Sequence, residues 1–120
     1  MIVMEVLVKK NFRVMLLTLL ITILPQPIPA HAAGSILYVK EMASGNADCS
    51  NWANACTLQT ALVQAQATDE IWVQADVYKP GAARTDSFAL KNGVALYGGF
   101  WGTETNRDER DWLANPTILS

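Results

Sequence analysis

Three short apolar segments recur along the later part of the sequence at roughly even intervals of about twenty-odd residues. They are residues 70–75, 94–102 and 116–120. Residues 94–102 are the most distinctive, because a strand-like VALY run leads directly into a cluster of glycines and aromatic residues. Even spacing of short strand-like segments is typical of stacked repeats, so the sequence predicts a β-solenoid.

The first 32 residues have the pattern of a secretory signal peptide. Residues 14–24 are apolar and uncharged, three basic residues precede them, and an Ala-His-Ala sequence ends at Ala32. Eleven apolar residues fall short of the roughly 20 that a membrane-spanning helix needs, which disfavours the alternative of an uncleaved anchor. We therefore expect cleavage after Ala32, with translation starting at Met1 or Met4, and a mature domain of residues 33–120.

Removal of the signal changes the charge and the available chemistry. The mature domain keeps six Lys and Arg against ten Asp and Glu, so its net charge is 6 − 10 = −4. Such a domain has no electrostatic reason to bind nucleic acid, and we expect membrane contact only through the signal before cleavage. The single histidine, His31, leaves with the signal, which excludes a Ser-His-Asp triad. We expect no enzymatic site and no cofactor.

Cys49 and Cys56 are seven residues apart in a polar loop that covers residues 41–54 and continues to the second cysteine. An isolated cysteine pair in a short exported chain most often forms a disulfide, and closing so small a loop contributes roughly 2 to 3 kcal/mol. A reactive or metal-binding pair is the weaker alternative, because a zinc site needs more ligands than two cysteines provide.

Residues 57–67 change from strand-like to helical periodicity. Thr57 stands where an N-cap is expected, and the glutamines point away from the apolar face. The apolar face has the spacing i, i+3, i+4 and i+7 of an amphipathic helix, and its residues are Leu58, Ala61, Leu62 and Ala65.

Alternation assigns the faces of the expected strands. Within residues 70–75, Ile71 and Val73 share one side and Trp72 faces the other. We expect Leu96 to contact Ile71 on one side and Ile118 on the other. The inward residues of successive rungs are then Ile71, Val73, Val94, Leu96 and Ile118.

The segments between the rungs also carry local signals. Residues 35–40 read as a short first strand, residues 76–87 as a surface excursion and residues 88–90 as a brief strand. The Gly98-Gly99 pair permits a bend that side chains with a Cβ would resist.

A short helical turn is expected after Gly102. Asn106 and Glu109 match a capping box, and Trp112 with Leu113 is expected to supply the packing face of that turn.

Several short motifs resemble those of a known group of proteins. They are CSNW at 49–52, ACTLQ at 55–59, DEIWV at 69–73, VYKP at 77–80, LKNGVALYGGF at 90–100, GTET at 102–105 and RDW at 110–112. Together they resemble the opening segment of bacterial secreted right-handed parallel β-helix proteins, the pectin-lyase-like group. The resemblance implies that residues 57–67 cover the open end of the first coil and that the later strands stack as parallel rungs. It also implies further coils, so we expect the sequence to be a fragment.

The tryptophans and the missing catalytic motif leave three hypotheses about function. Trp72 and Trp112 are expected to pack, whereas Trp52 and Trp101 lie in loops and are candidate contacts for a ligand. The leading hypothesis is an exported, non-enzymatic start of a surface solenoid for adhesion or passive binding of glycans or proteins. The alternatives are the leading piece of a secreted polysaccharide lyase or hydrolase with its catalytic coils downstream, and a small disulfide-linked carbohydrate-binding module.

Overall fold

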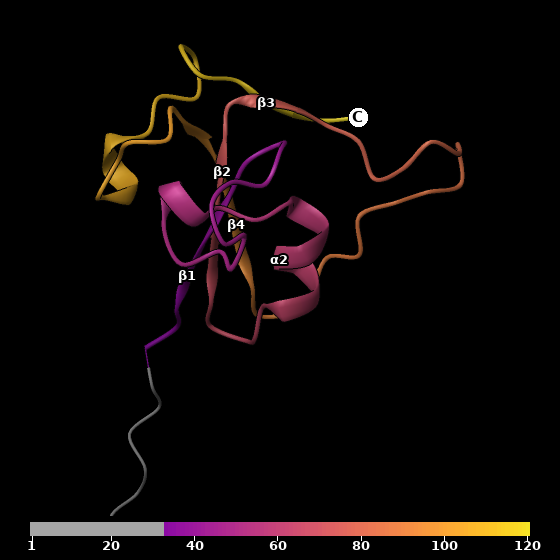
Figure 1. The fold of residues 1–120 in the computed structure, drawn as a ribbon, viewed down its shortest axis with the longest axis horizontal. Coiled ribbons are helices and arrows are strands. Elements are labelled where there is room, and N and C mark those ends of the chain that lie inside the picture. Colours follow the sequence, from indigo (N-terminus) through magenta and orange to yellow (C-terminus); the bar gives the residue numbers. More distant parts are fainter. Residues whose placement is uncertain (1–32) are drawn as a thin grey trace, which may run out of the picture. The chain divides into compact units, whose positions relative to one another are not determined.

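The computed structural model describes residues 33–120, which form a small mixed α/β domain with parallel sheets and more strand than helix (Figure 1). The expected signal peptide, its cleavage after Ala32 and the choice of start codon lie outside the described residues. The elements in chain order are β1 (Ile36–Val39), η1 (Trp52–Asn54), α2 (Leu58–Gln64), β2 (Glu70–Gln74), β3 (Asp76–Tyr78), β4 (Ala95–Phe100), η2 (Arg107–Glu109) and β5 (Thr117–Leu119).

The larger sheet has three parallel strands in the order β1-β2-β4. Leu37 lies opposite Ile71, and Ile71 lies opposite Leu96. The expected pairing of Ile71 with Leu96 is therefore confirmed, and the first strand lies at an edge of this sheet. Because these strands are parallel and distant in sequence, each pairing requires a long crossover connection.

The second sheet pairs β3 with β5 in parallel, with Val77 opposite Ile118. The expected place of Ile118 as the next rung beside Leu96 is wrong, because the chain bends at Ala75 and β5 pairs with β3 in the second sheet. Ile118 is 49% exposed. Residues 76–87 are also not wholly loop, since they begin with β3, and the brief strand expected at residues 88–90 is not formed.

One face of the larger sheet packs against α2. Thr57 is the N-cap, as expected, and its side chain accepts a hydrogen bond from the backbone N–H of Thr60. At the other end of the helix, the ammonium group of Lys91 donates to the carbonyls of Val63 and Ala65, which satisfies acceptors that the helix leaves free. The apolar face expected for this helix is buried, and the core comprises Leu37, Val39, Cys49, Cys56, Leu58, Ala61, Leu62, Ala65, Ile71, Val73 and Tyr78, with Phe88, Val94 and Leu96 packed partly buried against it.

The opposite face of the larger sheet is covered as well, by aromatic side chains. Trp72 is 2% exposed, which confirms that it packs, and its ring stacks on Phe100 at a centroid distance of 4.8 Å. Tyr38 and Trp52 complete this aromatic cluster, with ring centroids 5.0 Å apart. Edge-to-face and offset contacts of this kind add about 0.5–1.5 kcal/mol beyond the buried area.

A bulge in β4 brings Phe100 to this face. Trp72 pairs with Tyr97 and Gln74 pairs with Phe100, so β4 has one more residue than β2 over the same length. Gly99 has a φ of +91°, and a Cβ there would lie 2.9 Å from the backbone of Trp112. A Cβ on Gly98 would lie 2.7 Å from Thr117. The expected bend at these glycines is therefore a bulge against which later segments pack closely.

Candidate functional site

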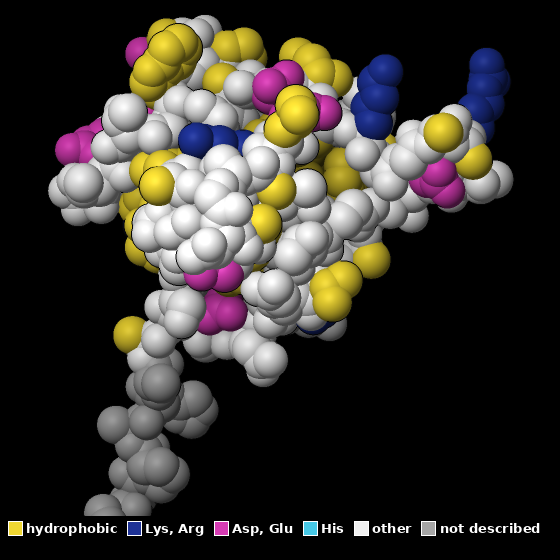
Figure 2. All heavy atoms as spheres, viewed as in Figure 1, with side chains coloured by type: hydrophobic (Ala, Val, Ile, Leu, Met, Phe, Trp, Pro, Cys, Tyr) yellow, Lys and Arg dark blue, Asp and Glu magenta, His cyan; other side chains and the backbone are white. Residues whose placement is uncertain are grey.

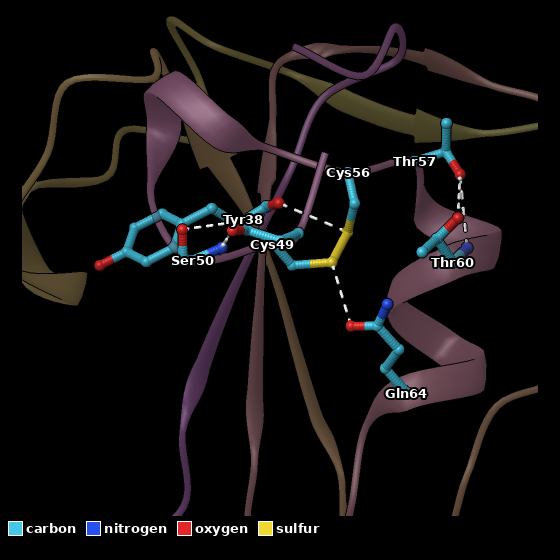
Figure 3. The surroundings of a disulfide bond; sticks show 8 residues. Tyr38, Cys49, Ser50, Cys56, Thr57, Thr60 and Gln64 are labelled. Carbon is cyan, nitrogen blue, oxygen red and sulfur yellow. Dashed lines mark hydrogen bonds between the residues drawn. A yellow bond between two sulfur atoms is a disulfide. The ribbon is translucent and has the colours of Figure 1, made fainter. Parts of the chain in front are cut away.

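The disulfide loop, residues 49–56, lies along the edge of β1 that does not pair with β2 (Figure 3). Cys49 and Cys56 are bonded, as expected, and are 1% and 0% exposed. The backbone N–H of Tyr38 donates to the Cys49 carbonyl at 2.9 Å, and the Cys56 N–H donates to the Tyr38 carbonyl at 3.1 Å. Cys56 also forms a parallel bridge with Val39, so the loop occupies the place of a neighbouring strand.

Local hydrogen bonds hold this loop in shape. Asn51 caps η1 by accepting the backbone N–H of Asn54 at 2.9 Å. Asp48 accepts hydrogen bonds from the hydroxyl and the backbone N–H of Ser50, and these bonds hold the pKa of the Asp48 carboxyl below its usual value. The polar residues that marked this segment as a loop therefore determine its conformation.

The edge at β4 is more open than the edge at β1. Leu96 and Val94 are only half-buried, whereas Val39 on β1 is fully buried. The second sheet also exposes apolar side chains, because Ile118 and Leu119 are 49% and 43% exposed. Figure 2 shows hydrophobic side chains at the surface along the side of the molecule where β3 and the C-terminal segment run.

A row of aromatic and charged side chains lies on residues 97–112. The guanidinium of Arg110 lies 5.2 Å from the ring centroid of Tyr97 and 5.4 Å from that of Trp112. Arg107 lies 4.8 Å from the Tyr97 ring and forms an ion pair with Glu70 at 2.7 Å. These distances are within the range of cation–π attraction. We call Tyr97, Arg107, Arg110 and Trp112 the arginine-aromatic row.

Two carboxylates fix the loop that carries this row. Burial raises the pKa of Glu104, but hydrogen bonds from backbone N–H groups, including those of Trp101 and Gly102, outweigh it and leave the pKa lowered. Glu109 accepts the N–H of Asn106 at 2.9 Å, as the capping-box pattern predicted, and this bond is the main reason for its lowered pKa. Both carboxylates therefore hold backbone in place in their ionised form.

The tryptophans differ in part from the sequence-based expectation. Trp52 is half-buried, its ring packs against Tyr38 and Phe100, and its indole N–H donates to the Glu104 carbonyl at 2.9 Å. Trp101 is 66% exposed. The packing expected for Trp112 and Leu113 is wrong, because they are 62% and 85% exposed.

Sequence reasoning missed the arginine-aromatic row, although RDW at 110–112 was noted for another reason. The alternating charges of residues 107–111 are typical of a solvated helical turn and do not indicate a binding surface. Only the folded structure shows that Tyr97 lies against Arg107 and Arg110.

A separate cavity of about 240 Å³ opens between the N-terminal end of α2 and the segment after β3. Its lining mixes apolar and polar side chains with one acidic and one basic residue, and comprises Glu41, Thr57, Leu58, Gln59, Tyr78, Lys79 and Phe88. Burial, followed by the negative charges of Asp76 and Glu41, raises the pKa of the Tyr78 hydroxyl. That hydroxyl donates to the Gln74 carbonyl at 2.9 Å, so its role is structural.

Within residues 33–120, no group of three or more His, Cys, Asp and Glu side chains is placed to hold a metal ion. The helices of the same residues include none long and apolar enough to cross a membrane.

The described residues thus define a small parallel-sheet domain with one edge closed by a disulfide loop and an exposed arginine-aromatic row. Comparison of the chain with models of protein families, with curated proteins and with solved structures found no match.

Proposed function

We propose that residues 33–120 are the capped N-terminal start of an exported right-handed parallel β-helix, a structural and binding module of a secreted or cell-surface protein. The observation that carries this proposal is the difference between the two edges of the larger sheet. The β1 edge is closed by Cys49, Cys56 and their hydrogen bonds to Tyr38, whereas the β4 edge leaves Val94 and Leu96 half-buried. Parallel strands can be added only where an edge is free.

The helix and the disulfide support this proposal. In the proposed β-helix, α2 covers the end of the first coil, since it buries Leu58 and Leu62 against the inner face of the sheet. Disulfides persist in oxidising compartments, which agrees with export of the chain. Exposed apolar residues on β5 would be buried by the next coil.

Intact mass of the secreted protein tests export. We expect loss of residues 1–32 and of two hydrogens for the Cys49–Cys56 bond. Free thiols or a retained N-terminal segment would contradict the exported, disulfide-linked state.

Amide exchange tests the solenoid. Successive backbone N–H groups of a strand point to opposite edges. The Ala95 N–H donates to the Asp69 carbonyl, just before β2, and the Ser120 N–H donates to the Tyr78 carbonyl of β3. The N–H groups of the adjacent residues Leu96 and Leu119 therefore point to the outer edges of β4 and β5, where a further strand would pair. We would compare the 120-residue chain with a longer chain that includes whatever is encoded in frame beyond Ser120. Exchange at Leu96 and Leu119 should slow in the longer chain, while Tyr38, already bonded to the disulfide loop, serves as the unchanged control.

An immediate in-frame stop, or unchanged exchange at Leu96 and Leu119, would refute the solenoid. Clustered Asp and Arg in the continuation would favour a polysaccharide lyase or hydrolase over a passive binding module.

A further inference from the structure

Two tryptophans are exposed to an extent that folding does not explain. Trp101 and Trp112 are 66% and 62% exposed, although Trp is usually highly buried. Trp52 and Trp72, in contrast, pack in the aromatic cluster. Large exposed apolar rings next to polar groups are typical of binding surfaces.

Hydrogen bonds fix the backbone on both sides of Trp112. The backbone N–H of the preceding Asp111 donates to the Gly99 carbonyl at 2.8 Å, and its carboxylate accepts the N–H groups of Leu113 and Ala114, both at 3.0 Å. The guanidinium of Arg110 lies over the ring, 5.4 Å from its centroid, and Trp112 is still 62% exposed. A side chain whose backbone is already fixed loses less conformational entropy when a ligand stacks on it.

Trp101 lies on the neighbouring segment of chain. The backbone of Trp112 packs against Gly99, two residues before Trp101. Glu104 accepts the backbone N–H groups of Trp101 and Gly102, which fixes this segment also.

The surrounding charge indicates an uncharged ligand. Residues 104–111 carry two arginines and four carboxylates, for a local charge of 2 − 4 = −2. Arg107 is already paired with Glu70, so it adds little attraction for an anion. Polyanions and acidic lipid surfaces are therefore repelled rather than attracted.

We propose that Trp112, backed by Arg110, stacks against the apolar face of a sugar ring in an uncharged polysaccharide, with Trp101 as a second contact. The C–H face of the sugar covers the indole on the side away from Arg110, whose guanidinium lies over the ring and donates to the Gly98 carbonyl. This inference rests on the binding part of the proposed function but does not depend on further coils.

Binding to named polysaccharides tests the proposal on the secreted chain. We would measure retardation in gels containing soluble neutral glucan or mannan, with polygalacturonate as the acidic comparison, and tryptophan fluorescence on addition of cello- and chito-oligosaccharides. Trp112→Ala should weaken binding of a neutral sugar at least about tenfold, as central aromatic contacts do. Trp101→Ala should weaken it as well.

Leu113→Ala is the matched control, because Leu113 is the adjacent residue and is 85% exposed. It should leave sugar binding unchanged, and all three variants should keep the thermal unfolding midpoint of the parent chain within a few degrees. Absence of binding to any neutral sugar, preference for polygalacturonate, or equal weakening by Leu113→Ala would overturn the proposal; the last result would indicate a general apolar contact with protein. Amide exchange at Leu96 and Leu119 tests the proposed solenoid and does not depend on sugar binding. The solenoid proposal and the sugar-binding proposal can therefore be refuted independently of each other.

Discussion

Removing the disulfide should destabilise the domain both globally and at one defined edge. The bond between Cys49 and Cys56 closes a loop of eight residues, given a sequence separation of seven. In the chain-entropy treatment this closure is worth about 2.5 kcal/mol at 25 °C. Both sulfurs are almost fully buried, so Cys49→Ala/Cys56→Ala also loses packing, and we expect a total loss of about 3–5 kcal/mol.

That loss is large for a domain of this size. The described 88 residues, 33 to 120, correspond to a free energy of unfolding of about 4–13 kcal/mol. Urea denaturation followed by fluorescence measures the change. Reduced parent protein is the matched control, because it keeps both sulfur atoms and loses only the crosslink, so it should lose about 2.5 kcal/mol.

The local effect separates an edge closure from a simple crosslink. Tyr38 and Lys40 donate their backbone N–H groups to Cys49 and Cys56. Their amide exchange should accelerate more than that of Val73, which lies in the central strand. The reasoning fails if the reduced protein loses less than about 1 kcal/mol, or if Tyr38 and Lys40 accelerate only as much as Val73.

Three further predictions follow from the aromatic cluster, the bulge and the loop carboxylates. Phe100→Ala should cost about 3–5 kcal/mol in urea denaturation, against less than about 0.5 for the exposed control Leu113→Ala; equal effects would contradict the packing role of Phe100. Gly99→Ala should cost at least about 1–2 kcal/mol because φ is +91°, and should change the fluorescence of Trp112, which its new Cβ would displace; an unchanged spectrum would argue against the bulge. The lowered pKa of Glu104 means that its contribution to stability is complete above the ordinary Glu pKa of about 4.3 and is lost as pH falls through the lower folded value. Glu104→Gln should flatten stability measured between about pH 5 and 2, and an unchanged profile would refute this.

Elements determined by local sequence were predictable. Thr57 and the i, i+3, i+4, i+7 spacing of Leu58, Ala61, Leu62 and Ala65 predict α2, because a helix forms its hydrogen bonds within itself. The pairing of Ile71 with Leu96 followed from alternation once parallel rungs were assumed.

Elements that depend on distant partners were not predictable. β3 has three residues beginning with Asp76, and it forms only because Thr117–Leu119 pairs with it. Residues 88–90 have comparable strand character but gain no partner, and Phe88 packs against the core instead. The local sequence does not say which of two such segments will find a neighbour.

The exposure of Trp112 was not expected, and the packing partner of Trp52 could not be predicted, for one physical reason. The bulge at Gly98-Gly99 turns Phe100 to the aromatic face, where it gives Trp52 a packing partner. The same glycines let the backbone of Trp112 approach β4, which leaves the Trp112 ring outside. Which aromatic ring is buried therefore depends on the register of β4 against β2. A shift of one residue in that register moves each side chain to the other face of the sheet.

The bulge also limits how a further strand could pair with β4. The Gly98 carbonyl accepts a hydrogen bond from Arg110, and the Gly99 carbonyl accepts the N–H of Asp111. The second half of this edge is thus already occupied by the chain, while the half before Gly98 is free of these contacts. In the proposed β-helix, the next strand of the larger sheet would pair with residues 95–97 and leave the sheet before Gly98. The arginine-aromatic row would then remain at the surface beside the coil, where a neutral sugar could still reach Trp112.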